Sequence, residues 1–127
     1  MAFNSQLAWH SLQGGVETIN NTQTTALSFV LTANGVYRVV VELVARDNTS
    51  GKSICGTKAT TFERVSGTTT QVATSLVDMI ATLISDAVNN AGATWTIDNS
   101  GDTIRVRVTG NTGRTIEWQA KLEITMN

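Results

Sequence analysis

The last third of the chain alternates apolar and polar residues with a period of two. In residues 103–109 the apolar positions are Ile104, Val106 and Val108. In residues 115–126 they are Ile116, Trp118, Ala120, Leu122, Ile124 and Met126. Successive side chains on a β-strand point to opposite faces, so each segment has one apolar face and one polar face. Together with a shorter strand over residues 93–97, these segments predict an antiparallel sheet with one face in a core.

Three more strands are expected upstream, over residues 24–32, 36–46 and 52–65. The first two are separated by Asn34-Gly35, the strongest short hairpin signal in the chain, because both residues accept positive φ. We therefore expect a tight turn between these two strands, which would pair as a hairpin.

Residues 68–90 fit two patterns. Helical spacing relates Leu76, Met79, Ile80, Leu83, Ala87 and Val88. A period of two instead places Val77, Met79, Ala81 and Leu83 on one face of a strand. Because the rest of the chain reads as β, we expect a strand here, with a helix as the alternative.

Strands at roughly ten-residue spacing with turn residues between them are typical of an all-β sandwich or jelly roll. We therefore predict an antiparallel β-sandwich, jelly-roll-like, over residues 18–127, preceded by a connector or attachment arm over residues 1–17. Residues 3–13 read equally as a connector or as a first edge strand. The expected core consists of Leu27, Phe29, Tyr37, Val39, Val41, Leu43, Trp95, Ile104, Val106, Trp118, Leu122 and Ile124.

Composition narrows the classes of function. The 127 residues are 41% hydrophobic and 15% charged, which fits one folded domain. The net charge of −1 gives no bulk attraction to nucleic acid, and no apolar run reaches the length of a membrane span. The first residues lack the basic and apolar regions of a signal peptide.

Few residues offer chemistry. Cys55 and His10 are the only cysteine and the only histidine, so a Cys/His pair would need both and has no recognisable third group. Asp98 and Asp102 flank a turn but lack the ligand count of a calcium loop. We therefore expect no cofactor and no metal.

The remaining charged residues give no catalytic set either. Glu117 and Glu123 share a strand face but lie roughly 20 Å apart along it, too far for a pair of glycosidase carboxylates. Arg105 and Arg107 share a face, and Glu117 or Glu123 on the following strand are their expected ionic partners. We expect the protein not to be an enzyme, although two carboxylates meeting across a subunit boundary would leave no spacing signal.

Several motifs resemble a small β domain of tailed-phage virion proteins, often found at the C-terminal end of tail fibres. They are the strand of residues 37–46, the Ala-x-Trp of residues 93–95, the Ile-x-Val-x-Val-Thr-Gly of 104–110 and the Thr-Ile-x-Trp-x-Ala-x-Leu-Glu of 115–123. The resemblance covers about residues 18–125. It implies a virion protein, assembled in the bacterial cytoplasm and displayed on the particle, that trimerises and contacts other virion proteins.

Two roles within the virion remain open. One is a tail-fibre tip that attaches to a host glycan or protein; the other is a capsid decoration protein that stabilises the phage head. Turns carry recognition on such scaffolds. The candidate contact residues in the turns are Asp47, Asn48, Thr49, Asn111, Thr112 and Arg114, and Trp9 in the attachment arm is the candidate contact for the decoration role.

A homotrimer is also favoured by the second face of strand 36–46. Val36, Val40 and Val44 lie there among charged residues, opposite the expected core. A monomeric domain seldom leaves that much apolar surface of a strand exposed, which favours contact with another subunit. The alternative is that a second sheet or residues 75–88 of the same chain cover these valines.

Overall fold

The computed structural model describes residues 8–72 and 76–127, which form nine strands and contain no helix. The strands are β1 (Ala8–Ile19), β2 (Gln23–Val30), β3 (Gly35–Asp47), β4 (Lys52–Val65), β5 (Thr68–Gln71), β6 (Val77–Ile84), β7 (Thr94–Ser100), β8 (Thr103–Thr109) and β9 (Thr115–Met126). The prediction of an all-β chain is confirmed. Among the described residues, no helix has the length and apolarity that crossing a bilayer would need.

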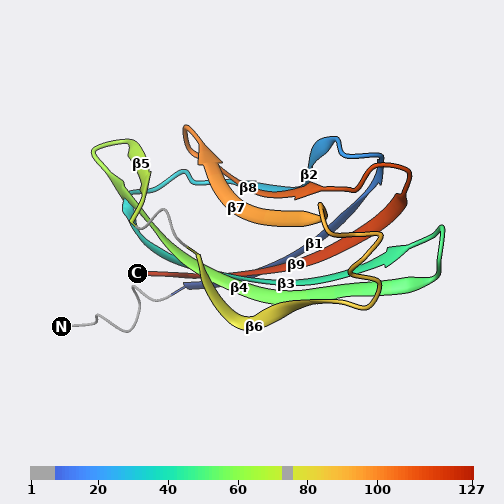
Figure 1. Cartoon of the computed structure of the whole chain (residues 1–127). Coiled ribbons are helices and arrows are strands. Elements are labelled where there is room, and N and C mark those ends of the chain that lie inside the picture. The colour runs from blue at the N-terminus through green and yellow to red at the C-terminus, as the bar shows by residue number, and fades with distance from the viewer. Residues whose placement is uncertain (1–7, 73–75) are drawn as a thin grey trace.

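The strands form two antiparallel sheets. The larger has the order β1-β9-β3-β4-β5, with β6 pairing the same strand β4 beside a different stretch of it. The smaller has the order β2-β8-β7. The larger sheet is strongly curved, and the smaller sheet lies over its concave side (Figure 1). The expected jelly-roll strand order and the trimer stay predictions.

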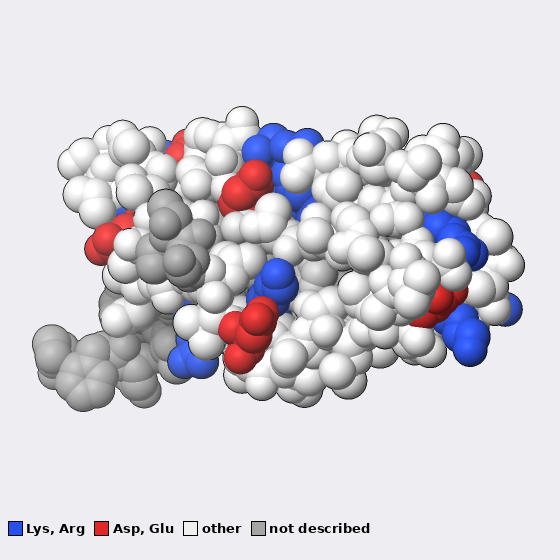
Figure 2. Space-filling view, in the orientation of Figure 1, with Lys and Arg blue, Asp and Glu red and all other residues white. Residues whose placement is uncertain are grey.

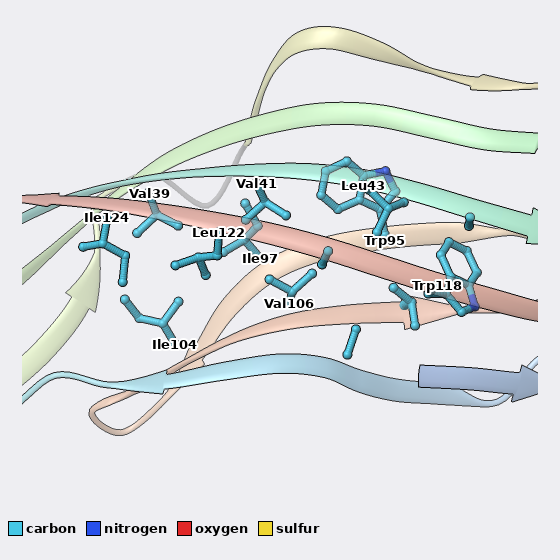
Figure 3. Close-up of a cluster of buried hydrophobic side chains, with 14 of the residues drawn as sticks. Val39, Val41, Leu43, Trp95, Ile97, Ile104, Val106, Trp118, Leu122 and Ile124 are labelled. Carbon is cyan, nitrogen blue, oxygen red and sulfur yellow. The ribbon is translucent and has the colours of Figure 1, made fainter. Parts of the chain in front are cut away.

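The core fills the space between the two sheets. Buried side chains of β3 and β9 from the large sheet meet those of β7 and β8 from the small one (Figure 3). Ten of the twelve expected core residues are buried, and Leu27 and Phe29 are partly buried against the same cluster. Burial of a side chain of this size contributes about 1.5–3 kcal/mol relative to exposure. The alternation seen in the sequence therefore identified the core correctly.

Side chains of the large sheet also cover the free edge of β7. Lys58 donates from Nζ to the carbonyl of Trp95 at 2.9 Å, and Gln71 donates from Nε2 to the carbonyl of Ile97 at 3.2 Å. An unpaired strand edge presents backbone groups that could pair with another chain. These two side chains occupy acceptors along that edge and tie the sheets together.

The ambiguous stretch is extended. Residues 77–84 form β6 and 68–71 form β5, so the strand interpretation is confirmed for these residues and the helix interpretation is wrong for them. Residues 85–92 form the turns that follow, and residues 73–75 lie outside the described part. The backbone of β6 forms its strand hydrogen bonds with β4 on one side. The helical spacing within residues 76–88 carries no information about this pairing with a distant segment.

The expected hairpin at Asn34-Gly35 is wrong. β2 pairs with β8 in the small sheet, whereas β3 lies between β4 and β9 in the large one, so the chain crosses between sheets at this point. The Asn34 Oδ1 accepts hydrogen bonds from Arg64 Nη1 at 2.9 Å and from the Gly67 backbone at 3.0 Å. Its side chain thus anchors the β4–β5 turn.

The boundary expected between residues 17 and 18 falls inside a strand. Residues 8–19 form β1, which pairs with β9 from Ala8–Met126 to Ile19–Thr115. Of the two interpretations of the first segment, an edge strand holds for residues 8–13. Residues 1–7 lie outside the described part of the chain.

Candidate functional site

Four turns meet at one end of the two sheets, on the right in Figure 1. They comprise residues 20–22, 48–51, 85–93 and 110–114, and together they are called the turn cluster below. The backbone of Asn48 donates to the carbonyl of Thr115 at 2.8 Å, and that of Asn20 donates to the carbonyl of Arg114 at 3.0 Å. The turn 48–51 is therefore fastened to the first residue of β9, and the turn 20–22 to the residue just before it.

The carboxylate of Asp47, at the end of β3, joins three of these segments. Its side chain is completely buried and accepts hydrogen bonds from the Thr49 backbone at 2.9 Å, from Ser50 Oγ at 3.1 Å and from Asn90 Nδ2 at 3.0 Å. The Nη1 of Arg114 lies 3.4 Å from Asp47 Oδ2. A buried carboxylate is tolerated where it is paired and hydrogen-bonded in this way.

The protonation of Asp47 follows from these contacts. Burial raises the pKa of the Asp47 carboxyl. The hydrogen bonds from Asn90, Thr49 and Ser50, together with the positive charge of Arg114, lower this pKa by a larger amount. The pKa of Asp47 is therefore below its ordinary value. The carboxylate therefore stays ionised and keeps the three segments joined at neutral pH.

Asparagine side chains complete the cluster. Asn111 accepts from the Gly92 backbone at 2.8 Å and donates from Nδ2 to the carbonyl of Asn89 at 2.6 Å. Asn20 Oδ1 accepts from the Gly113 backbone at 2.9 Å. The turns 20–22 and 85–93 are thus both held by the turn 110–114.

The turn cluster and the end of β3 beneath it bring together six of the seven residues expected to contact a partner. Asn48, Thr49 and Thr112 are exposed, whereas Asp47 and Arg114 lie beneath them and act as the support. Asn111 is half-buried. A partner approaching this end meets amide and hydroxyl groups, Val88, which is 90% exposed, and the exposed charged side chains of Arg46 and Lys52 beside the turn 48–51.

Trp9 is not part of this cluster. It pairs with Thr125, ten residues along β9 from Thr115, which corresponds to roughly 33 Å of strand. The predicted contact residues therefore lie in two separate places: Trp9 is near the start of β1, and the other six are near its end. A single small partner does not reach both places.

The other candidate groups are separated. His10 is on β1 and Cys55 on β4, three strand positions apart in the large sheet, or roughly 14 Å in the pairing direction alone. Asp98 accepts from Arg105, and Asp102 accepts from Arg64 and Thr69. Hydrogen bonds from Thr69 and Arg64 lower the pKa of the Asp102 carboxyl.

The expected partners of the β8 arginines are wrong. Arg105 forms a bidentate pair with Asp98 of β7, at 2.8 and 2.9 Å, because β8 lies between β2 and β7 and not beside β9. This pairing raises the pKa of Arg105. Arg107 lies between Thr25 and Thr96, and its Nε is buried with no hydrogen-bond partner among the described residues.

The surface beside the turn cluster carries one of several groups of charged side chains, at the right-hand end of the molecule in Figure 2. Lys, Arg, Asp and Glu occur in a few separate groups on the face shown in Figure 2, and most of that face is uncharged. Within residues 8–72 and 76–127, no three His, Cys, Asp or Glu side chains are close enough to hold a metal ion together.

Comparisons with known proteins were made with both the sequence and the structure. No protein-family model matches the sequence, and no curated protein matches it. Among solved structures, the crystal structure of the tailspike protein of Acinetobacter baumannii phage AM24 superposes with a TM-score of 0.47 at 11% sequence identity. The match covers 99% of this chain and 27% of the tailspike.

A second similar structure is tailspike protein gp49 of the Acinetobacter baumannii bacteriophage Fri1, described as a capsular polysaccharide depolymerase. It superposes with a TM-score of 0.45 at 12% identity, over 98% of this chain and 20% of the tailspike. The chain thus spans only a small part of either tailspike. At these TM-scores and identities, neither likeness assigns a function to the chain.

Proposed function

We propose that the chain is a virion domain of a tailed phage that attaches to the host surface from the tip of a tail fibre, with the turn cluster as its contact surface. The proposal starts from the resemblance of residues 18–125 to such domains. The motifs that carry this resemblance form β3, β7, β8 and β9, and their buried positions build the core.

The observation that carries the role of the turn cluster is its support. Asp47 contacts the turn 48–51, Asn90 and Arg114 through its buried carboxylate, so the turns that carry the exposed side chains are ordered before any partner binds. A binding surface that is already ordered loses less conformational entropy on binding. A rigid scaffold carrying recognition on its loops is the usual arrangement for this purpose.

The exposed candidate residues favour a hydrogen-bonding partner. Asn48, Thr49 and Thr112 offer amides and hydroxyls and bring no charge. Sugar hydroxyls and protein backbone groups both match this chemistry. The turns hold no aromatic residue on which a sugar ring would stack, so both a host glycan and a host protein remain candidate receptors.

The proposal includes a homotrimer on the virion surface, in contact with other virion proteins. It also includes the absence of catalysis, since the cysteine and the histidine are far apart and the acidic residues near the arginines are engaged in ion pairs. Incubating the purified protein with host capsule or lipopolysaccharide tests the latter. Steady release of reducing ends that disappears on mutation of one Asp or Glu would overturn it.

The role in attachment is tested by incubating labelled protein with host cells and with purified capsids, side by side. We expect binding to cells and none to capsids. Binding only to capsids would contradict the attachment role and support capsid decoration.

A further inference from the structure

One arginine of the small sheet has no counterion within the described part of the chain. Arg107 lies on β8, the middle strand, on the face that points away from the core. None of the ion pairs formed by the described residues includes Arg107, and its buried Nε donates to none of these residues. A charged group with a buried donor is ordinarily paired, because removing it from water without a partner costs free energy. Arg107 therefore has the features of a residue whose partner comes from another molecule.

The other two charges of the small sheet compensate each other. Arg105 and Asp98 form the bidentate pair at 2.8 and 2.9 Å. The strands β2, β7 and β8 contain no further charged residue, so two positive charges and one negative charge leave a net charge of +1. Basic and acidic side chains lie side by side at the top of the molecule in Figure 2, over the small sheet. This face therefore attracts an anion, and the charge that remains for it is that of Arg107.

Neutral hydrogen-bonding side chains surround Arg107. Thr25 of β2 and Thr96 of β7 pair with it on either side, and side chains directly opposite each other have their Cβ atoms about 4.5–5.5 Å apart. At the next position of the same face, β8 has a threonine between a glutamine of β2 and a second threonine of β7. Hydroxyl and amide groups both donate and accept hydrogen bonds. The surface made by Gln23, Thr25, Thr94, Thr96, Arg107 and Thr109 is called the Arg107 site below.

The Arg107 site adjoins the turn cluster. Its residues Gln23 and Thr94 begin the strands that follow two of the turns, and Thr109 ends the strand that precedes a third. Arg107 is two residues from the end of β8, or roughly 7 Å along the strand. A polymer that lies along the outer face of the small sheet therefore passes from the Arg107 site directly onto the turn cluster.

The chemistry of the Arg107 site favours a sugar that carries a carboxylate. A guanidinium presents two N–H donors side by side to the two oxygens of a carboxylate, and the threonine hydroxyls match the hydroxyls of a sugar. A peptide would instead add to a free strand edge. Lys58 and Gln71 already occupy acceptors along the free edge of β7. The Arg107 site also has no aromatic side chain of the kind that anchors protein partners.

We propose that the Arg107 site binds the carboxylate of an acidic glycan, with the neighbouring sugars of the same chain lying on the turn cluster. The terminal Nη groups of Arg107 donate to the two carboxylate oxygens, and Thr25 and Thr96 exchange hydrogen bonds with the hydroxyls of the same sugar. This inference rests on the attachment role proposed above and names the chemical class of the receptor.

The test is binding of the purified chain to three soluble polymers of acidic sugars, namely polygalacturonate, alginate and hyaluronan, measured by calorimetry. We expect binding to at least one of them. The methyl ester of that polymer keeps the sugar rings and removes the charge, so it should bind at least tenfold more weakly. No binding to any of the three polymers, or equal binding of the ester, would overturn the proposal. Polyglutamate that binds as tightly as the best of the three would assign the site to an acidic protein and would also overturn it.

The role of Arg107 is tested by Arg107→Met, which keeps the apolar stem and removes the guanidinium. We expect its affinity to fall at least tenfold. Its Tm should not fall below that of the wild type, because a buried donor without an acceptor has been removed. The matched control is Arg38→Met, which makes the same change of charge at an exposed position on the outer face of the large sheet and should bind as the wild type does. An Arg107→Met variant that keeps its affinity, or an equal loss in Arg38→Met, would overturn the proposal.

The two proposals fail in different ways. Polymer binding is measured without host cells, whereas attachment is measured on them. A chain that binds cells but none of the acidic polymers would refute the Arg107 site alone. A chain that binds an acidic polymer through Arg107 but binds no cells would refute the attachment role alone.

Discussion

The indole Nε1 of Trp118 donates a hydrogen bond of 2.8 Å to the hydroxyl Oγ1 of Thr18, one hundred residues earlier in the chain. Both residues are buried, Thr18 at 2% exposure and Trp118 at 0%. The bond links β1 and β9 beneath the turn cluster. The bond gives the indole N–H of Trp118, the largest fully buried side chain, an acceptor inside the core. The surrounding aliphatic side chains have no acceptor to offer.

Replacing Thr18 by valine should destabilise the protein by about 1–3 kcal/mol, because the shape is kept while the indole N–H is left buried without an acceptor. The matched variant is Thr82→Val, whose hydroxyl accepts from Trp95 Nε1 at 2.9 Å. Thr82 is half-buried, so water can replace it and the loss should be smaller. Urea unfolding measures both. Equal losses would contradict the role assigned to burial.

Acid should weaken the support of the turn cluster through Asp47. Since the pKa of Asp47 is lowered in the folded protein, its ionised form adds stability above the ordinary value of 3.8, and this stability is lost as the pH falls through the lower folded pKa. Asp47→Asn should cost about 1.5–3 kcal/mol at pH 7, since it removes the charge from buried hydrogen bonds. Thermal unfolding from pH 7 to pH 2 measures the difference between the two proteins.

That difference in Tm should be constant above about pH 5 and shrink below the ordinary pKa of a carboxyl. Asp102, whose pKa is also lowered, contributes to the acid sensitivity of both proteins and cancels in the comparison. Asp78→Asn, at an exposed position of β6, is the control and should leave the Tm unchanged. A difference independent of pH would mean that the charge of Asp47 does not hold the turns.

The ion pair between Arg105 and Asp98 should contribute little despite its bidentate geometry. Both side chains are partly exposed, at 27% and 34%, so solvent screens their attraction. A double-mutant cycle with Arg105→Ala and Asp98→Ala should give a coupling energy of about 0.2–1 kcal/mol, reduced further in 1 M salt. A coupling above about 2 kcal/mol would show that the outer face of the small sheet is shielded from water, for example by a partner.

Local patterns predicted the core because burial alternates with the strand period. Trp118, Leu122 and Ile124 lie on the apolar face of their strand and are buried. The alternation along the strand is enough to predict this, without knowing which strand lies beside it. Pairing is different, because it depends on segments far apart in the chain. The backbone N–H of Leu31 donates to the carbonyl of Asp102 at 2.8 Å, which extends the contact between β2 and β8. The chain therefore stays with the small sheet up to Leu31 and does not form a hairpin at Asn34-Gly35.

The candidate site was predicted in part for the same reason. Turn residues such as Asn48 and Thr112 are polar and lie between strands, so their exposure follows from the local sequence. The burial of Asp47 does not, because its partner Asn90 is 43 residues away. An aspartate beginning a turn is ordinarily exposed, and no local signal marks this one as the support of three turns.

The account's central claim is that the exposed residues of the turn cluster contact the host surface. The most direct measurement is binding of labelled protein to host cells by Asn48→Arg and Thr112→Arg, compared with Thr70→Arg, which changes an exposed residue of β5 at the opposite end of the large sheet. All three positions are exposed, so each variant should fold with the Tm of the wild type. We expect the two cluster variants to lose binding at least tenfold and Thr70→Arg to bind as the wild type does. Unchanged binding by both cluster variants, or an equal loss in Thr70→Arg, would contradict the claim.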